Sequence, residues 1–148
     1  MVKIIGCGNR DRGDDQAGIL VAERLRLLGA TAAVHAGDAL SLIEKWDSDE
    51  DVILIDAIVS GDSPGAVRVW DSALPLSGFP TAAAGLAVSS HGFDIAKAIE
   101  LARALGRFPK RLRVYGIEGA NFDRGGDVSV AVATAIDVVV QRIRQEIT

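Results

Sequence analysis

The sequence predicts an α/β domain of three layers (α/β/α), in which a mixed, mainly parallel sheet of about five strands carries helices on both faces. Two observations lead to this prediction. Short apolar runs alternate along the chain with segments whose apolar residues recur every three or four positions, the order of repeated strand and helix. Residues 52–55 also read Val-Ile-Leu-Ile without polar alternation, as expected of a parallel strand buried on both faces.

The first half of the chain supplies the strands that we expect to build the candidate site. A first apolar run closes on a glycine-rich loop, and Gly37 and Asp38 precede a short periodic segment and offer it an N-terminal cap. The expected elements are a strand over residues 2–6, a helix over 15–28, a strand over 31–36, a helix over 40–46 and the central strand over 51–59.

The second half of the chain adds an edge strand. The turn at residues 61–65 is too short for a helical crossover, so the strand after it should pair antiparallel. Residues 71–90 form a long irregular stretch of the kind that often carries function. The expected elements are a strand over 66–70, a helix over 95–105 that ends at Gly106, a strand over 112–117 and a helix over 132–147.

Length and composition describe an ordinary globular protein. The chain has 148 residues, of which 49% are hydrophobic and 24% charged, so we assign one folded domain to residues 1–148. The formal net charge of -4 leaves no broad basic surface, and nucleic acid is therefore not an expected partner.

Compartment and membrane association are also predicted from the sequence. Cys7 is the one cysteine, so no internal disulfide is expected, and the chain enters a strand-like run without a charged leader and a long apolar core. The apolar stretch at 128–140 is interrupted by polar residues and is shorter than the roughly 20 residues of a membrane span. We expect a cytoplasmic protein without a membrane segment.

Polar residues at the expected carboxyl ends of the strands form the candidate site, because ligands of mainly parallel sheets bind beyond these ends. Asp15 follows the first strand, Asp56 ends the central strand, and His91 precedes a crossover helix that must begin at the same edge. Two carboxylates and an imidazole suit a divalent ion such as zinc or nickel and leave positions open for water or substrate. The sequence therefore predicts a metal site at this edge.

Each candidate residue also has a structural interpretation. Asp14 is interpreted as the cap of the helix that follows it, and Asp15 in the first turn would complement the helix dipole. Asp56 ends a buried apolar run, so it needs water, a partner or a metal to offset a large desolvation cost. An isolated histidine such as His91 is most often hydrogen-bonded near a helix start, and His35, at the end of the second strand, is kept as a supporting candidate.

The loop Gly6-Cys7-Gly8 begins like the Gly-x-Gly-x-x-Gly turn of dinucleotide-binding proteins. Asp11 stands where the third glycine would be, and the acidic pair that follows would repel phosphate at a helix start. We therefore expect no nucleotide cofactor. Cys7, held between two glycines, suits packing better than nucleophilic chemistry.

Taken in order along the chain, these motifs resemble those of the hydrogenase maturation endopeptidases. The matching residues are Gly6-Cys7-Gly8-Asn9, Asp14-Asp15 with Gly18, Ile55-Asp56-Ala57-Ile58 with Pro64-Gly65, Ser90-His91, and Phe108-Pro109-Lys110 before the last strand. Their order and spacing extend over nearly the whole chain and are more specific than any single motif.

The resemblance implies a sheet flanked by helices and an endopeptidase, nominally of the aspartic type, that cuts a C-terminal extension from the nickel-loaded large-subunit precursor of a nickel-iron hydrogenase. Asp15, Asp56 and His91 match the metal-contacting positions of that family, and the nickel would be supplied by the substrate. Bound metal could polarise the scissile carbonyl or lower the pKa of a water to roughly 7 while a carboxylate takes a proton. The residues do not distinguish these routes.

Two departures from the family pattern bear on substrate fit. Gln16 and Ala17 replace the glycine that commonly follows the paired acids, and the loop at residues 10–13 is unusually polar. Where many members carry Asp-Gly-Gly-Thr after the second strand, this chain has His-Ala-Gly-Asp at residues 35–38, so Asp38 or His35 would take the place of that aspartate. A second hypothesis therefore stays open, a non-catalytic module that binds a metalloprotein precursor without cutting it.

Overall fold

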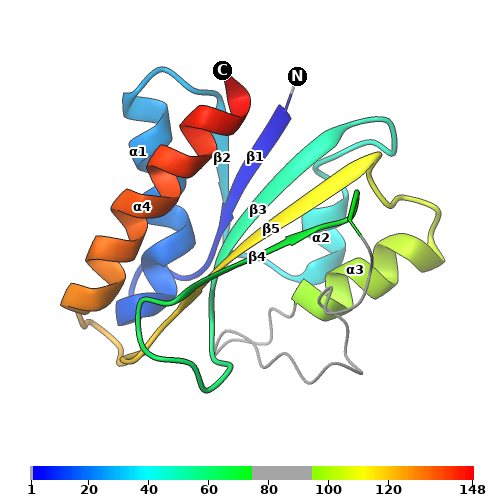
Figure 1. Cartoon of the computed structure of the whole chain (residues 1–148). Helices are drawn as coiled ribbons and strands as arrows, with labels where there is room; N and C mark the ends of the chain where they lie inside the picture. Colours follow the sequence, from blue (N-terminus) through cyan, green and yellow to red (C-terminus); the bar gives the residue numbers. More distant parts are fainter. Residues whose placement is uncertain (1, 75–94) are drawn as a thin grey trace.

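Among residues 2–74 and 95–148, the part of the chain that the computed structural model describes, five strands form one mixed sheet. Their bounds are β1 Val2–Cys7, β2 Ala32–His35, β3 Asp51–Ile58, β4 Val67–Asp71 and β5 Arg111–Glu118. The spatial order is β2-β1-β3-β5-β4, and β4 alone runs antiparallel, at one edge (Figure 1). The predicted mixed, mainly parallel sheet with β3 at its centre is confirmed.

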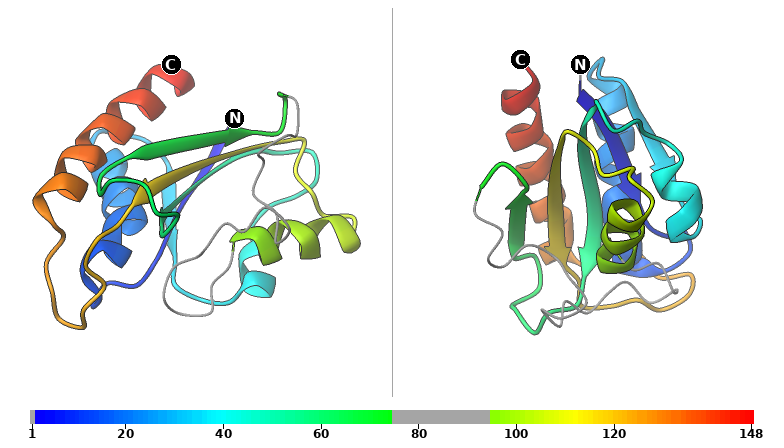
Figure 2. Two further views of the ribbon diagram at one scale, coloured as in Figure 1. Left: turned by 60° about the horizontal axis from the view of Figure 1, so that its bottom comes forward. Right: turned by 90° about the vertical axis from the view of Figure 1, so that its right-hand side faces the viewer.

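Helices cover both faces of this sheet. Their bounds are α1 Ala17–Leu27, α2 Ala39–Ile43, α3 Ile95–Ala104 and α4 Val130–Ile147. Two views show α1 and α4 on one face and α2 and α3 on the other (Figure 2), which gives the predicted three layers. No helix within the described ranges is both long enough and apolar enough to cross a membrane.

The central strand β3 contributes to two separate hydrophobic cores. Ile53 and Ile55 belong to the core beneath α1 and α4, whereas Val52 and Leu54 belong to the core beneath α2 and α3. Successive side chains of a strand point to opposite faces, so a strand covered on both sides needs an apolar residue at every position. This packing accounts for the unbroken apolar run in the sequence.

The segment between β1 and α1 begins differently from the prediction. The helix expected from residue 15 starts at Ala17 and is preceded by a short 3-10 turn, η1, at Gly13–Gln16. The N–H of Gly13 donates to the carbonyl of Gly126 at 3.1 Å, and that of Asp14 donates to the carbonyl of Asn121 at 2.7 Å. These bonds to the loop between β5 and α4 hold η1 in its own orientation, so α1 begins only after it.

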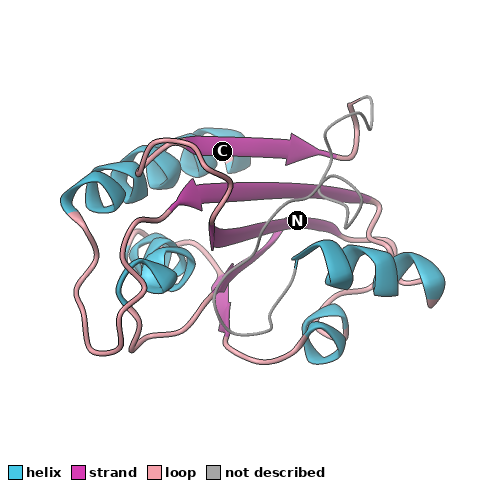
Figure 3. Cartoon of the chain, turned by 90° about the horizontal axis from the view of Figure 1, so that it is seen from below, coloured by secondary structure: helices cyan, strands magenta, loops and turns pink. Residues whose placement is uncertain are grey.

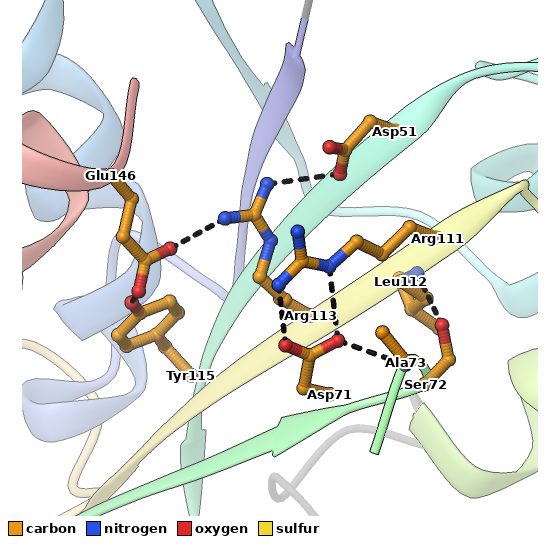
Figure 4. A network of polar contacts seen from close by, with 9 residues as sticks. All are labelled: Asp51, Asp71, Ser72, Ala73, Arg111, Leu112, Arg113, Tyr115 and Glu146. Carbon is orange, nitrogen blue, oxygen red and sulfur yellow. Dashed lines mark hydrogen bonds and ion pairs between the residues drawn. The ribbon is translucent and has the colours of Figure 1, made fainter. Parts of the chain in front are cut away.

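At the amino ends of the strands, a network of charged residues joins α4 to the sheet (Figure 4). The guanidinium of Arg113, 5% exposed, donates to Asp51 at 2.9 Å and to Glu146 of α4 at 2.7 Å. The hydroxyl of Tyr115 donates to the same Glu146. Burial raises the pKa of Tyr115, and this hydrogen bond raises it further. These contacts hold α4 against the amino edge of the sheet, opposite the edge that carries the candidate site.

Candidate active site

The candidate site lies where the parallel strands end, at the edge that Figure 3 views from below. β1, β2, β3 and β5 are mutually parallel, so their carboxyl ends share this edge. Asp56 lies near the carboxyl end of β3, and Asp15 lies in η1, directly after the loop that leaves β1. The sheet therefore brings together two carboxylates that are forty-one positions apart in sequence (56 minus 15).

Asp56 is 1% exposed, so its carboxylate is shielded from water and its charged form is disfavoured. Burial raises the pKa of Asp56 well above its usual range, and the nearby charge of Asp15 raises that pKa further. The backbone N–H of Ala57, which donates to Oδ1 at 2.9 Å, opposes these effects only in part. The two carboxyl groups therefore act on each other electrostatically and favour a shared proton or a cation.

Asp15 is also buried, at 1% exposure, and its backbone fixes its position. Its N–H donates to the carbonyl of Arg12 at 2.9 Å, and its carbonyl accepts from Asn9 at 3.1 Å. Gly8 has a φ of 149°, and a Cβ on it would lie 2.0 Å from the carbonyl oxygen of Asp15. The glycine-rich loop thus lets η1 approach the end of β1 closely, which is a packing role.

Asp14 is fully buried, and its carboxylate fastens η1 to the loop between β5 and α4. Oδ2 accepts from the N–H groups of Ala120 at 2.7 Å and Asn121 at 3.0 Å. Ser129 donates to the same carboxylate through its N–H at 2.7 Å and through its hydroxyl at 3.1 Å. Asp14 is therefore held by four hydrogen bonds and supports the turn that carries Asp15.

The capping role predicted for Asp14 is wrong. The N-cap of η1 is Arg12 and that of α1 is Gln16, and neither position has a side-chain capping bond. The reason is that the carboxylate of Asp14 binds backbone groups more than a hundred positions away, where the loop after β5 crosses η1. No residue near Asp14 in the sequence indicates these distant partners.

His35 is the last residue of β2 and pairs with Cys7 in the register of the sheet, and Asp38 follows three positions later. His35 is 7% exposed, and its Nε2 lies 3.0 Å from the carbonyl oxygen of Asp38. Asp38 is the N-cap of α2, where its carboxylate accepts from the N–H and the hydroxyl of Ser41, each at 2.8 Å. The predicted cap at Gly37 and Asp38 is confirmed, and these two candidates connect β2 to α2 at the rim of the site.

Cys7 ends β1 within the same region and is fully buried. Burial raises the pKa of the Cys7 thiol well above its usual range, and the charge of Asp56 raises it further. A thiol kept protonated is a poor nucleophile, so the packing role predicted for Cys7 agrees with its surroundings.

His91, the third predicted residue of the metal site, lies outside the described residues. Within residues 2–74 and 95–148, no group of three His, Cys, Asp or Glu side chains is arranged to hold a metal ion. The described part of the chain thus contributes two carboxylates, Asp15 and Asp56. Oxygen ligands of this kind suit a divalent cation, and a cation between them would offset both the burial and the repulsion that raise the pKa of Asp56.

Glu118 is a further buried carboxylate at this edge that was not predicted from the sequence. It ends β5, is 2% exposed, and accepts from the N–H of Ser60 at 3.0 Å and from the Ser60 hydroxyl at 2.5 Å. It therefore fixes the start of the loop that follows β3, two positions after the strand that carries Asp56. The available signal was an acid at the end of an apolar run, the same signal that identified Asp56.

Comparison with known proteins gives one family and one fold. The family described as hydrogenase maturation protease matches residues 23–146 of the chain. No curated protein matches the chain in sequence.

Several solved structures are similar to the chain over nearly its full length. The nickel-iron hydrogenase maturation protease HybD from Thermococcus kodakarensis is 23% identical, with 97% of each chain covered and a TM-score of 0.76. The hydrogenase maturating endopeptidase HybD from E. coli is 20% identical, with 96% of this chain and 88% of that chain covered and a TM-score of 0.72. The maturation protease HycI from Thermococcus kodakarensis KOD1 is 24% identical, with 97% of this chain and 90% of that chain covered and a TM-score of 0.66. These likenesses establish the fold.

Proposed function

The chain belongs to the hydrogenase maturation protease family, and from this premise we propose that it removes the C-terminal extension of a nickel-loaded nickel-iron hydrogenase large-subunit precursor. Membership makes the chain a peptidase of hydrogenase maturation, and the family match extends over 124 residues (146 minus 23, plus one). The precursor as partner and nickel as the recognised metal are the finer parts of the proposal.

The observation that carries the proposal is the buried pair Asp15 and Asp56. Two carboxyl groups that are each 1% exposed carry a desolvation cost, and the charge of Asp15 adds to the rise in the pKa of Asp56. Such a pair is poorly suited to stabilising a fold. It is well suited to a site that binds a cation, and with His91 it would offer the nickel of the precursor two oxygen ligands and one nitrogen ligand.

Nickel is part of the substrate in this proposal, so metal binding and substrate recognition are the same event. A precursor that carries nickel brings a positive charge to the carboxylate pair, whereas an empty precursor leaves the repulsion between Asp15 and Asp56 in place. The protein would therefore cut only the loaded form. Asp15 and Asp56 are also the candidate acceptors for the proton of the attacking water, because general bases in hydrolysis must lie beside the reacting groups.

The test is incubation of the purified protein with its cognate precursor, in nickel-loaded and in metal-free form, followed by mass spectrometry of the large subunit. We expect the loaded precursor alone to lose the mass of its extension. Asp15→Asn and Asp56→Asn should each slow the cut by about 10²- to 10⁴-fold, as for loss of a general base, whereas Asp49→Asn, an exposed change, should not. Equal cutting of both precursors would exclude nickel sensing.

The competing hypothesis of a non-catalytic module predicts a different result in the same experiment. The loaded precursor would then co-purify with the protein and keep its full mass at every time point. That outcome, obtained while another maturation protease cuts its own loaded precursor under the same conditions, would contradict the proposed activity.

A further inference from the structure

A polar pocket of about 530 Å³ lies at the same edge of the sheet as the carboxylate pair. Its lining residues are Asn9, Asp11, Arg12, Arg124 and Gly125. Three of them belong to the loop that leaves β1 and two to the loop that leaves β5, and these loops meet below the sheet (Figure 1). We call it the Arg12–Arg124 pocket.

The walls of the pocket are tied to the turn that carries Asp15. The N–H of Gly125 donates to the carbonyl of Asp11 at 2.6 Å, which joins the two loops directly. The side chain of Gln16 donates to the carbonyl of Gly126 at 3.2 Å, from within η1. The pocket and Asp15 therefore share one hydrogen-bonded unit, so a ligand in the pocket has a defined position relative to the carboxylate pair.

The two arginines give the pocket its charge. Within the described residues neither Arg12 nor Arg124 forms an ion pair, whereas Arg10, on the same loop, is bonded to Glu23 at 2.7 Å. Asp11 is the acidic residue of the lining, which leaves two positive charges against one negative charge. The chain as a whole carries a formal charge of -4, whereas the lining of this pocket carries a net positive charge.

We propose that the Arg12–Arg124 pocket binds a carboxylate of the precursor's C-terminal extension, either an acidic side chain or the terminal carboxylate. This inference rests on the proposed function and specifies which part of the substrate is recognised. Guanidinium groups bind carboxylates through paired, charge-assisted hydrogen bonds. The negative charge of Asp11 favours a singly charged group over a phosphate dianion, and a pocket of about 530 Å³ admits a side chain or a chain end. Binding there holds the extension in register across Asp15 and Asp56.

The first experiment measures cleavage of the loaded precursor by Arg12→Gln and Arg124→Gln. We expect each change to raise KM by about tenfold to a hundredfold, as for loss of hydrogen bonds to a charged group, with kcat within about twofold of the wild type. Arg10→Gln is the matched control, since its partner is Glu23 and it lies outside the pocket lining. Arg12→Lys and Arg124→Lys should recover part of the lost affinity. An unchanged KM in both glutamine variants would overturn the inference.

The second experiment measures binding without cleavage, using Asp56→Asn protein and dye-labelled peptides that match the precursor's extension. Fluorescence anisotropy is recorded for the free acid, for the C-terminal amide, and for a peptide whose Asp and Glu residues are replaced by Asn and Gln. Loss of affinity in the amide identifies the terminal carboxylate as ligand, and loss in the third peptide identifies a side chain. Equal affinity of all three, or affinity unaffected by Arg12→Gln, contradicts the proposed pocket.

The two experiments separate the inference from the proposed function. If the wild-type protein leaves the loaded precursor intact while the peptides still discriminate by charge, the proposed cleavage fails and the carboxylate pocket stands. If the precursor is cut with the same KM by wild type and both arginine variants, cleavage stands and the pocket assignment fails.

Discussion

At the scale of single residues, Asp14 and Asp56 at the carboxyl edge share nearly complete burial but differ in how their charge is compensated. Asp14 accepts four hydrogen bonds from groups of the chain. Asp56 accepts one from Ala57, and burial, followed by the charge of Asp15, raises its pKa. Burial alone thus does not separate a structural acid from a candidate ligand, and what distinguishes Asp14 from Asp56 is the number of hydrogen bonds to the carboxylate.

The raised pKa of Asp56 leads to a prediction about stability. The unfolded chain loses this proton near pH 4, whereas the folded chain holds it to higher pH, so the wild type loses stability as pH rises above about 4. Asp56→Asn removes that loss. We expect its melting temperature to exceed that of the wild type at pH 7, with the difference shrinking toward pH 4, while cleavage is slowed as proposed above. Each kcal/mol gained would raise the melting temperature by about 3 °C.

A matched change at Asp15 checks the cause. In Asp15→Asn the neighbouring charge is gone, so the pKa of Asp56 should fall toward its usual range, and carbon NMR of the carboxyl group would follow the titration. A melting temperature of Asp56→Asn below that of the wild type at pH 7, or a titration of Asp56 that Asp15→Asn leaves unmoved, would show that the two carboxyl groups do not interact as described.

A change at Asp14 is predicted to lower the stability of the fold, whereas Asp56→Asn is predicted to raise it. Asp14→Ala leaves backbone donors at Ala120, Asn121 and Ser129 without their acceptor in a buried place. We expect the free energy of unfolding to fall by about 2–4 kcal/mol, measured by urea denaturation. Asp49→Ala, at an exposed site, should change it by less than about 0.5 kcal/mol. A loss at Asp14 no larger than that control would mean that the four bonds do not hold η1.

At the residue scale, the position of Asp15 and Asp56 at one edge of the sheet could be predicted from sequence, whereas their catalytic and metal-binding roles stay predictions. Asp56 stands out because it ends an apolar run, and Asp15 because it follows the first strand, so their shared edge follows from strand direction alone. The partners of Asp14 could not be found in this way, since Ala120 and Ser129 belong to a loop whose path is set by packing. His91 lies outside the described residues, so its place in the site stays a prediction.

At the scale of elements, the junction of β1, η1 and α1 depends on close backbone contact. Gly6 and Gly18 approach each other so closely that a Cβ on Gly6 would lie 2.1 Å from the carbonyl oxygen of Gly18. The glycine-rich loop and its helix follow from the sequence, but the helix begins at Ala17 and not at the predicted residue 15. The 3-10 turn could not be predicted, because the bonds that define it come from the distant loop after β5.

Gly8→Ala tests this junction. The added Cβ would meet the carbonyl oxygen of Asp15 at 2.0 Å, so η1 must shift, and we expect both the free energy of unfolding and kcat to fall, the latter by about tenfold or more. Gly29→Ala is the control, because Gly29 also has a positive φ, 95°, but has open space around its Cβ position. It should cost about 1–2 kcal/mol of stability and leave kcat unchanged. Equal effects on kcat would show that backbone strain, not the contact with η1, is responsible.

At the scale of the whole molecule, the two edges of the sheet have different roles. The amino edge is closed by Arg113, Asp51 and Glu146, which fasten α4 to the strands. The carboxyl edge carries the buried carboxylates and the Arg12–Arg124 pocket. Strand and helix order predicted this architecture and the edge of the site, because crossover direction is restricted in parallel sheets. It did not predict the amino-edge network, whose members are distant in sequence.

The separation of the edges is testable with Glu146→Ala. This change removes one of two partners of the buried Arg113, and we expect a loss of about 1–2 kcal/mol in the free energy of unfolding, since Glu146 is partly exposed. Glu23→Ala breaks an exposed pair with Arg10 and should cost less. Both variants should keep the wild-type kcat and KM. A change in kcat for Glu146→Ala would contradict the division of roles.

The measurement that tests the central claim most directly is the mass of the cognate large-subunit precursor after incubation with wild-type and Asp56→Asn protein, with nickel present or absent in the precursor. The buried carboxylate pair predicts that only wild-type protein and only the loaded precursor give the shortened subunit. If Asp56→Asn cuts at the wild-type rate, or if the wild type cuts the metal-free precursor equally well, the pair does not engage the nickel of the substrate.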